Sequence, residues 1–111
     1  MKTILATLLF VVVLVTPAAA LAAGDAVAGK DVFLKKCASC HGQQGEGKET
    51  IAKSLNVKFR HLGSTEVQAK TDADFKKAIG EGTGKMKAVK DLDAKAVDDV
   101  LAFVRTLKAT K

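Results

Sequence analysis

The stretch Cys37-Ala38-Ser39-Cys40-His41 is the most informative part of the chain, because it places two thiols three positions apart and an imidazole directly after the second. On a helix, residues three positions apart lie on one face, so both sulfurs can reach one edge of a flat porphyrin ring. The imidazole that follows can turn over the ring face and give a nitrogen to the iron. The pentapeptide is typical of covalent c-type haem attachment, with Cys37 and Cys40 as the anchors and His41 as the proximal ligand.

Three other interpretations of these residues stay open. A thioredoxin-like redox pair also uses C-x-x-C but expects a βαβ pattern, and residues 25–60 show no convincing strand. A structural zinc site needs four ligands, and the two cysteines are accompanied only by His41 and the distant His61. A plain disulfide between Cys37 and Cys40 suits an oxidising compartment but leaves His41 unexplained.

Residues 1–22 are predicted to be a secretory signal peptide. Lys2 supplies the positive start, residues 4–15 form an apolar run, and Ala20-Leu21-Ala22 is a small-x-small cleavage site. Cleavage near Ala22 and Ala23 leaves one domain, residues 23–111, in the periplasm. The alternative is an uncleaved membrane anchor, because the apolar segment approaches spanning length. The domain would then be a haem-bearing redox subunit or sensor of a membrane-associated complex.

The chain left after cleavage is short and basic. Removing 22 of the 111 residues leaves 89, enough for one domain with a marginal core, so a covalently held porphyrin would supply much of the apolar centre. The formal net charge is +6 for the whole chain and +5 without Lys2. Because the basic residues are spread out and the protein is exported, nucleic acid is not an expected partner. The charge favours redox proteins with acidic docking surfaces, and membrane contact only through partner complexes.

Caps and apolar spacing predict three helices, and no strand alternation persists, so we expect an all-α domain. Asp25 caps a first helix that extends to about Cys40. A second helix over residues 71–79 begins with an approximate capping box and stops at Gly80. Asp93 caps the last helix, which has a buried stripe and a water-facing side. The stripe comprises Val97, Val100, Leu101, Val104 and Leu107, and the water-facing side comprises Lys95, Asp98, Asp99, Arg105 and Lys108.

The second axial ligand is expected to be Met86, the only methionine outside the signal segment. Three glycines precede it in Gly80-Glu81-Gly82-Thr83-Gly84-Lys85-Met86-Lys87, and two lysines flank it, which is not the setting of a core methionine. A thioether on this connector can swing over the porphyrin face opposite His41. The rival ligand is His61, which would give bis-histidine coordination, and an open iron is the third possibility.

The CASCH motif, the G-x-G-K-M loop and the closing Leu101-Ala102-Phe103-Val104-Arg105 together resemble a small monohaem class I c-type cytochrome of bacterial, periplasmic type. The resemblance covers residues 25–109. It implies three to five helices around one covalently bound haem. The N- and C-terminal helices of such a fold cross at a glycine and an aromatic residue, here Gly29 or its neighbour Phe33 with Phe103.

The same resemblance implies low-spin iron bound by His41 and Met86, one exposed haem edge, and a monomeric electron shuttle rather than an enzyme, with no small-molecule substrate. The family often has proline directly after the methionine, where this chain has Lys87, which predicts a looser methionine loop. It often has another proline whose carbonyl accepts the proximal imidazole proton; here we expect that acceptor within residues 48–53, with Ile51 the nearest match. The lysines expected near the exposed edge are Lys48, Lys85, Lys87 and Lys90.

Overall fold

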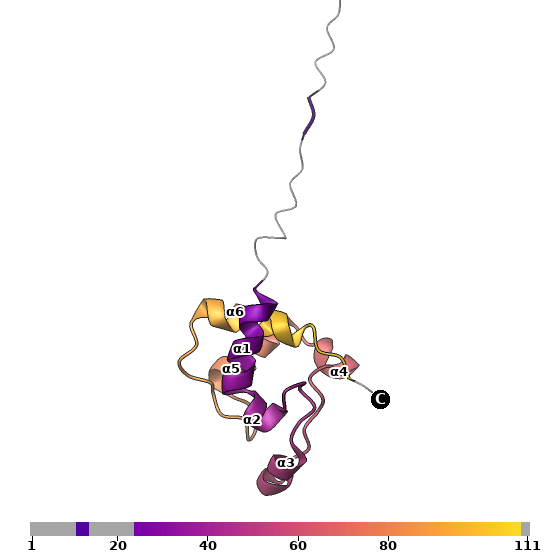
Figure 1. Cartoon of the computed structure of the whole chain (residues 1–111), viewed down its shortest axis with the longest axis vertical. Coiled ribbons are helices and arrows are strands. Elements are labelled where there is room, and N and C mark those ends of the chain that lie inside the picture. Colours follow the sequence, from indigo (N-terminus) through magenta and orange to yellow (C-terminus); the bar gives the residue numbers. More distant parts are fainter. Residues whose placement is uncertain (1–10, 14–23, 110–111) are drawn as a thin grey trace, which may run out of the picture.

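The computed structural model describes residues 11–13 and 24–109, so most of the predicted signal peptide lies outside the described residues. Figure 1 shows α1 and α6 crossing at one end of the domain, with α2 and then α3 toward the other end. Within the described ranges there is no β-strand, and the all-α prediction is confirmed. No helix in the described part of the chain is both long and apolar enough to cross a membrane. The helices are α1 (Ala26–Lys36), α2 (Ala38–His41), α3 (Glu49–Leu55), α4 (Thr65–Gln68), α5 (Asp72–Glu81) and α6 (Ala94–Val104).

The first helix begins as predicted and ends earlier. The Asp25 side chain accepts hydrogen bonds from the backbone N–H groups of Val27 and Ala28, at 2.9 and 3.2 Å. The single helix predicted to extend to Cys40 is wrong, because the backbone leaves helical geometry at Cys37, with φ −121° and ψ −34°. The bend separates α1 from α2 and coincides with the burial of Ala38 in the hydrophobic core. Tertiary packing therefore overrides the local helical pattern at this position.

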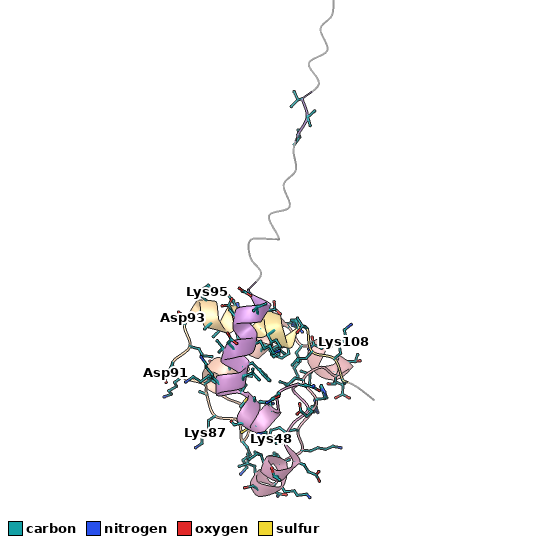
Figure 2. All side chains as sticks on the ribbon, viewed as in Figure 1. Lys48, Lys87, Asp91, Asp93, Lys95 and Lys108 are labelled. Carbon is teal, nitrogen blue, oxygen red and sulfur yellow. The ribbon has the colours of Figure 1, made fainter. Side chains whose placement is uncertain are left out.

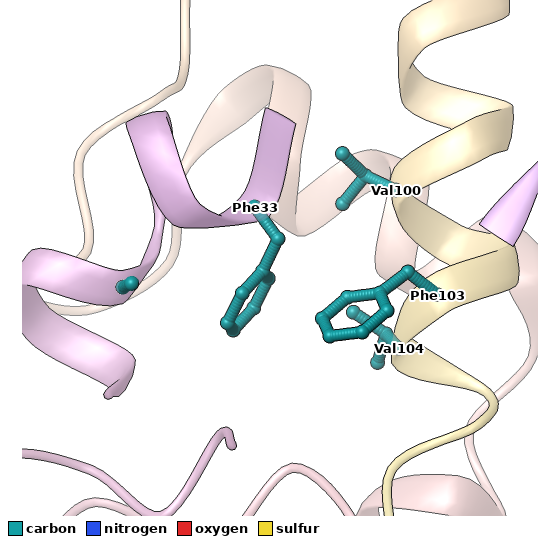
Figure 3. Close-up of a cluster of buried hydrophobic side chains, with 5 residues drawn as sticks. Phe33, Val100, Phe103 and Val104 are labelled. Atoms are coloured by element: carbon teal, nitrogen blue, oxygen red, sulfur yellow. The ribbon is translucent and has the colours of Figure 1, made fainter. Parts of the chain in front are cut away.

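The crossing of α1 and α6 is the centre of the fold. A Cβ atom added to Gly29 would lie 1.8 Å from the backbone oxygen of Asp99, so the two helices approach at a distance that only glycine permits. One turn further along α1, the Phe33 ring lies 5.1 Å from the Phe103 ring, centroid to centroid, in a tilted arrangement (Figure 3). Such pairs add about 0.5–1.5 kcal/mol beyond area burial. The buried cluster comprises Phe33, Ala38, Val100, Phe103 and Val104.

The cap predicted for α5 is confirmed, but its predicted end is wrong. Thr71 and Asp74 form a full capping box, in which each side chain accepts the backbone N–H of the other residue. The helix continues through Gly80 to Glu81 and ends at Gly82, which has φ 80°. Gly80 does not adopt a positive φ, so it is an ordinary helical glycine and not a stop.

Asp99 is buried and does not face water as predicted. Only 5 % of the residue is exposed, and its carboxylate accepts the backbone N–H of Asp25 at 2.8 Å and the Lys95 ammonium at 2.7 Å. The bond to Asp25 joins the beginning of α1 to the middle of α6. The Lys95 ammonium and then the Asp25 N–H lower the pKa of Asp99, while the Asp99 carboxylate raises the pKa of Lys95.

Arg105, predicted to face water, instead joins α6 to the chain between α4 and α5. Its guanidinium donates to the carbonyls of Gln68 and Lys70, both at 2.7 Å, and to the Asp72 carboxylate at 2.7 Å. The guanidinium carbon also lies 4.7 Å from the ring centroid of Phe75. These contacts hold the beginning of α5 against the end of α6.

Asp99→Asn is expected to lower the unfolding temperature at neutral pH, because the amide keeps an acceptor for Asp25 but loses the charge that pairs with Lys95. A carboxyl whose folded pKa is depressed stabilises the fold above its ordinary pKa of about 4, and this contribution is lost as pH falls through the folded value. The unfolding temperatures of wild type and Asp99→Asn, measured from neutral pH down to pH 2, should therefore become equal at the acid end. The control is Asp98→Asn, which removes a half-exposed pair with Lys76 and should cost about 0.5 kcal/mol or less. Parallel curves for wild type and Asp99→Asn down to pH 2 would contradict this role of Asp99.

Candidate haem site

The CASCH motif lies where the core meets the surface. Cys37 and Cys40 are half-buried free thiols on either side of the buried Ala38. The Cys37 carbonyl accepts the N–H of Cys40 at 3.2 Å and that of His41 at 2.9 Å, so one helical turn separates the two cysteines in spite of the bend. Burial raises the pKa of Cys37 to about 11, which keeps this side chain a neutral thiol at neutral pH.

His41 is the last residue of α2 and is half-buried. Burial lowers its pKa, which favours the neutral imidazole that can bind a metal ion. Its Nδ1 atom is buried and has no hydrogen-bond partner in the described part of the chain. The acceptor expected within residues 48–53 is therefore not in place, and that expectation is wrong for this structure. The imidazole instead packs on Phe59, with ring centroids 5.5 Å apart.

The chain that returns from the loop after His41 closes the end of α2. The backbone N–H of Gly47 donates to the His41 carbonyl at 2.6 Å, and that of Lys48 donates to the Cys40 carbonyl at 2.9 Å. These bonds satisfy carbonyl groups that the end of a helix leaves free. The motif is thus held on one side by Ala38 in the core and on the other by this returning segment.

Met86 lies on a closed turn. Thr83 and Met86 exchange two backbone hydrogen bonds, of 3.0 and 2.9 Å, around Gly84 and Lys85. Past the turn, the N–H of Val89 donates to the Ile79 carbonyl at 2.7 Å, which ties the connector back to α5. These hydrogen bonds close the loop without proline, and the looser methionine loop stays a prediction.

The sulfur-bearing side chain of Met86 is half-buried. Figure 2 shows Lys87, the residue after Met86, toward the same end of the domain as Lys48 and α2. The chain next to Met86 therefore lies toward the same end of the domain as the CASCH motif.

His61 is held by the chain near it. Its Nδ1 atom accepts the backbone N–H of Gly63 at 2.9 Å, and its carbonyl accepts the N–H of Ser64 at 3.0 Å. The imidazole stabilises the turn that leads into α4, and only Nε2 is left for another partner. Because a neutral imidazole that accepts at Nδ1 carries its proton on Nε2, this hydrogen bond disfavours His61 as the second axial ligand.

Comparison with known proteins identifies the family. Residues 26–108 match the family model described as cytochrome c. This chain belongs to the cytochrome c family. Cytochrome c-554(547) of Halothiobacillus neapolitanus is 35 % identical over 92 residues, which cover 78 % of this chain and all of that protein. The solved structure of the KustC0563 c-type cytochrome superposes with a TM-score of 0.63 at 28 % identity, covering 73 % of this chain and 98 % of that one. The class I c-type fold predicted from the sequence is confirmed.

Cytochromes of this family carry a covalently bound c-type haem, and Cys37 and Cys40 are consistent with its attachment site. The packing of this cytochrome fits such a group. No residue of α3 or α5 is fully buried, and the apolar side chains next to the core are only partly covered. These partly covered side chains leave apolar surface for a flat apolar cofactor to cover, and the buried Nδ1 of His41 still lacks the hydrogen-bond partner that such a buried atom normally has. The partly covered side chains packed on the core are Val32, Cys37, Leu62, Phe75, Ile79 and Leu107.

The sequence did not reveal two residues next to this cytochrome site. Phe59 packs on His41 from eighteen positions away, and a single phenylalanine in an irregular segment carries no periodic signal. Ala38 anchors the motif in the core, although its place between the cysteines says nothing of burial. Helical spacing could have indicated one missed contact of the buried Asp99, its pairing with Lys95 four positions earlier.

Proposed function

We propose that this cytochrome is an exported single-electron carrier. Its haem would be attached through Cys37 and Cys40, and its iron would be bound by His41 and Met86. The observation that carries the proposal is the half-buried His41 beside two half-buried thiols on one helical turn. Membership of a family of haem-based electron carriers supports the same reaction class.

When bound, the haem supplies an iron that exchanges one electron between the ferrous and ferric states. The chain contributes fixed ligands, so little has to move when the charge changes. His41 offers a neutral nitrogen from the end of α2, and Met86 offers a soft sulfur that favours the ferrous state and raises the reduction potential. Half-buried apolar side chains exclude water from the cofactor, which also favours the less charged form.

Export follows from the signal segment proposed at residues 1–22, with residues 23–111 as a monomeric periplasmic domain. The mass of the protein recovered outside the cytoplasm tests this: a chain that starts near Ala23 supports the proposal. A chain that starts at Met1 supports the alternative, a haem-bearing redox subunit or sensor held to a membrane complex by the retained segment.

Redox proteins with acidic surfaces are the proposed partners. The lysines expected near the haem edge, Lys48, Lys85, Lys87 and Lys90, are all exposed. Figure 2 shows Lys48 and Lys87 toward the α2 end of the domain, whereas Lys95 lies at the opposite end, beside the beginning of α1. Positive charge near the site would steer acidic proteins into weak, salt-sensitive complexes.

A spectroelectrochemical titration of the purified holoprotein tests the proposed function. We expect a reversible one-electron transition with six-coordinate, low-spin spectra in both states. Electron transfer to an acidic redox protein should slow as salt is added, because screening weakens the encounter. A high-spin spectrum, or turnover of peroxide, would instead indicate an enzyme with an open iron.

The two cysteines are expected to share the covalent attachment. Cys37→Ser and Cys40→Ser should each keep haem on the chain after denaturation, through the remaining thioether, and the double variant should lose it completely. The measurement is haem-dependent staining of the denatured protein together with its mass. Ser39→Ala, an exposed position between the anchors, is the control and should retain full staining. Haem that stays covalently bound in the double variant would contradict the assignment.

A further inference from the structure

Gly82 stands where the chain carrying Met86 folds back onto the end of α5. The N–H of Gly82 caps α5 by donating to the Ala78 carbonyl at 2.9 Å. Its backbone has φ 80° and ψ 170°, a conformation that side-chain-bearing residues rarely adopt. A Cβ atom at Gly82 would lie 2.6 Å from the Met86 carbonyl oxygen and 2.9 Å from the Ala88 nitrogen. The segment from Met86 to Ala88 therefore passes directly over Gly82, in space that a methyl group would occupy.

The turn and this contact act together. Two hydrogen bonds between Thr83 and Met86 close the turn, and the bond from Val89 to Ile79 closes the connector behind it. The residues that pass close over Gly82, Met86 to Ala88, lie directly between these two sets of hydrogen bonds along the chain. The backbone of Met86 is thereby fixed relative to α5.

We propose that Gly82 is a positioning residue for the second axial ligand: the close passage of the chain over Gly82 holds Met86 where its sulfur reaches the iron. The inference rests on the proposed function, in which Met86 is that ligand. Gly82 touches neither iron nor haem in this role. It acts through the backbone of Met86 alone.

The test compares glycine variants of the ferric holoprotein. Gly82→Ala should lose the weak far-red absorption that a methionine sulfur bound to ferric haem produces, and it should bind added imidazole at least about tenfold more tightly. The matched control is Gly80→Ala in the same helix, since a Cβ there meets nothing within 4 Å. Gly80→Ala should keep both the absorption and the wild-type imidazole affinity.

Gly84→Val tests the same positioning of Met86 if Gly82→Ala does not accumulate with haem. Gly84 has φ 54° and open space around its Cβ position, so Gly84→Val strains the turn and leaves α5 and the core untouched. We expect imidazole to bind this variant about tenfold more tightly. Hydrogen exchange gives a readout that is independent of the haem spectrum. The backbone amides of Met86 and Val89 should exchange faster than in wild type in Gly82→Ala and Gly84→Val, and at the wild-type rate in Gly80→Ala.

The outcomes separate this inference from the proposed function. If wild type shows the far-red absorption and neither turn variant changes it, the imidazole affinity or the amide exchange, Gly82 does not position the ligand. If wild type lacks the absorption and Met86→Leu leaves imidazole affinity unchanged, Met86 is not the ligand, and the proposed function falls together with the inference.

Discussion

Met86→Leu is expected to lower the reduction potential by on the order of 0.1 V and to open the iron to carbon monoxide. Leucine has no lone pair to give to the iron but fills a similar volume, so the fold should survive with a loss below about 1.5 kcal/mol. The potential falls because the thioether stabilises the ferrous state more than the ferric state. Spectroelectrochemistry of the variant, followed by carbon monoxide addition to its ferrous form, measures both effects.

The control for this variant is the rival ligand. His61→Asn keeps an oxygen where Nδ1 accepts the Gly63 N–H but cannot bind the iron through Nε2. The potential and the carbon monoxide behaviour should match wild type. Carbon monoxide binding by His61→Asn, with no change of potential or of carbon monoxide binding in Met86→Leu, would reverse the assignment in favour of bis-histidine coordination.

Gly29→Ala is expected to destabilise the holoprotein by about 3 kcal/mol. Alanine favours a helix over glycine by about 1 kcal/mol, but the added methyl would collide with the backbone of α6 at Asp99. The helices would have to move apart, and the contact between Phe33 and Phe103 would loosen with them. The midpoint of thermal or denaturant unfolding, followed by helical circular dichroism, measures the loss.

Gly80→Ala serves as the matched control for Gly29→Ala, because both glycines lie within helices and only Gly29 meets a neighbouring backbone. Gly80→Ala should raise the free energy of unfolding by about 0.5–1 kcal/mol. If the free energy of unfolding falls in Gly29→Ala and rises in Gly80→Ala, the close approach of α1 and α6 is the cause of the loss in Gly29→Ala. If Gly29→Ala stabilises the protein as Gly80→Ala does, the observed crossing of α1 and α6 is wrong.

The features that could be predicted from the sequence are local ones. Asp25, Thr71 and Asp93 begin helices as their side chains predict, since a cap needs only the three residues that follow it. The CASCH motif likewise carries its chemistry within five residues. The position of the helix crossing could also be predicted, because the family resemblance pairs a glycine and an aromatic on the two end helices.

The features that could not be predicted depend on residues distant in the chain. The bend at Cys37 accompanies the burial of Ala38 in the hydrophobic cluster, which the helical pattern of α1 does not predict. The burial of Asp99 comes from a hydrogen bond to Asp25, 74 positions away. The hydrogen bond from Val89 to Ile79 and the close passage of residues 86–88 over Gly82 likewise join the connector to α5 in a way that no local motif indicates.

The crossing of α1 and α6 and the CASCH motif share one buried cluster, so the stability of the fold and the position of His41 depend on the same packing. Phe33 in the crossing packs in the same buried cluster as Ala38, which lies between the two attachment cysteines. The crossing therefore fixes the orientation of α2 and, through it, the position of His41. Substitutions in the crossing are expected to disturb the proximal side of the site as well as the fold.

Carbon monoxide added to the purified ferrous protein tests most directly whether protein side chains occupy both axial positions of the iron, because the gas binds only to iron with an open or easily vacated position. We expect the reduced spectrum to stay unchanged at neutral pH under saturating carbon monoxide. An immediate shift of the haem spectrum to that of a carbon monoxide complex would contradict a closed site with two protein ligands.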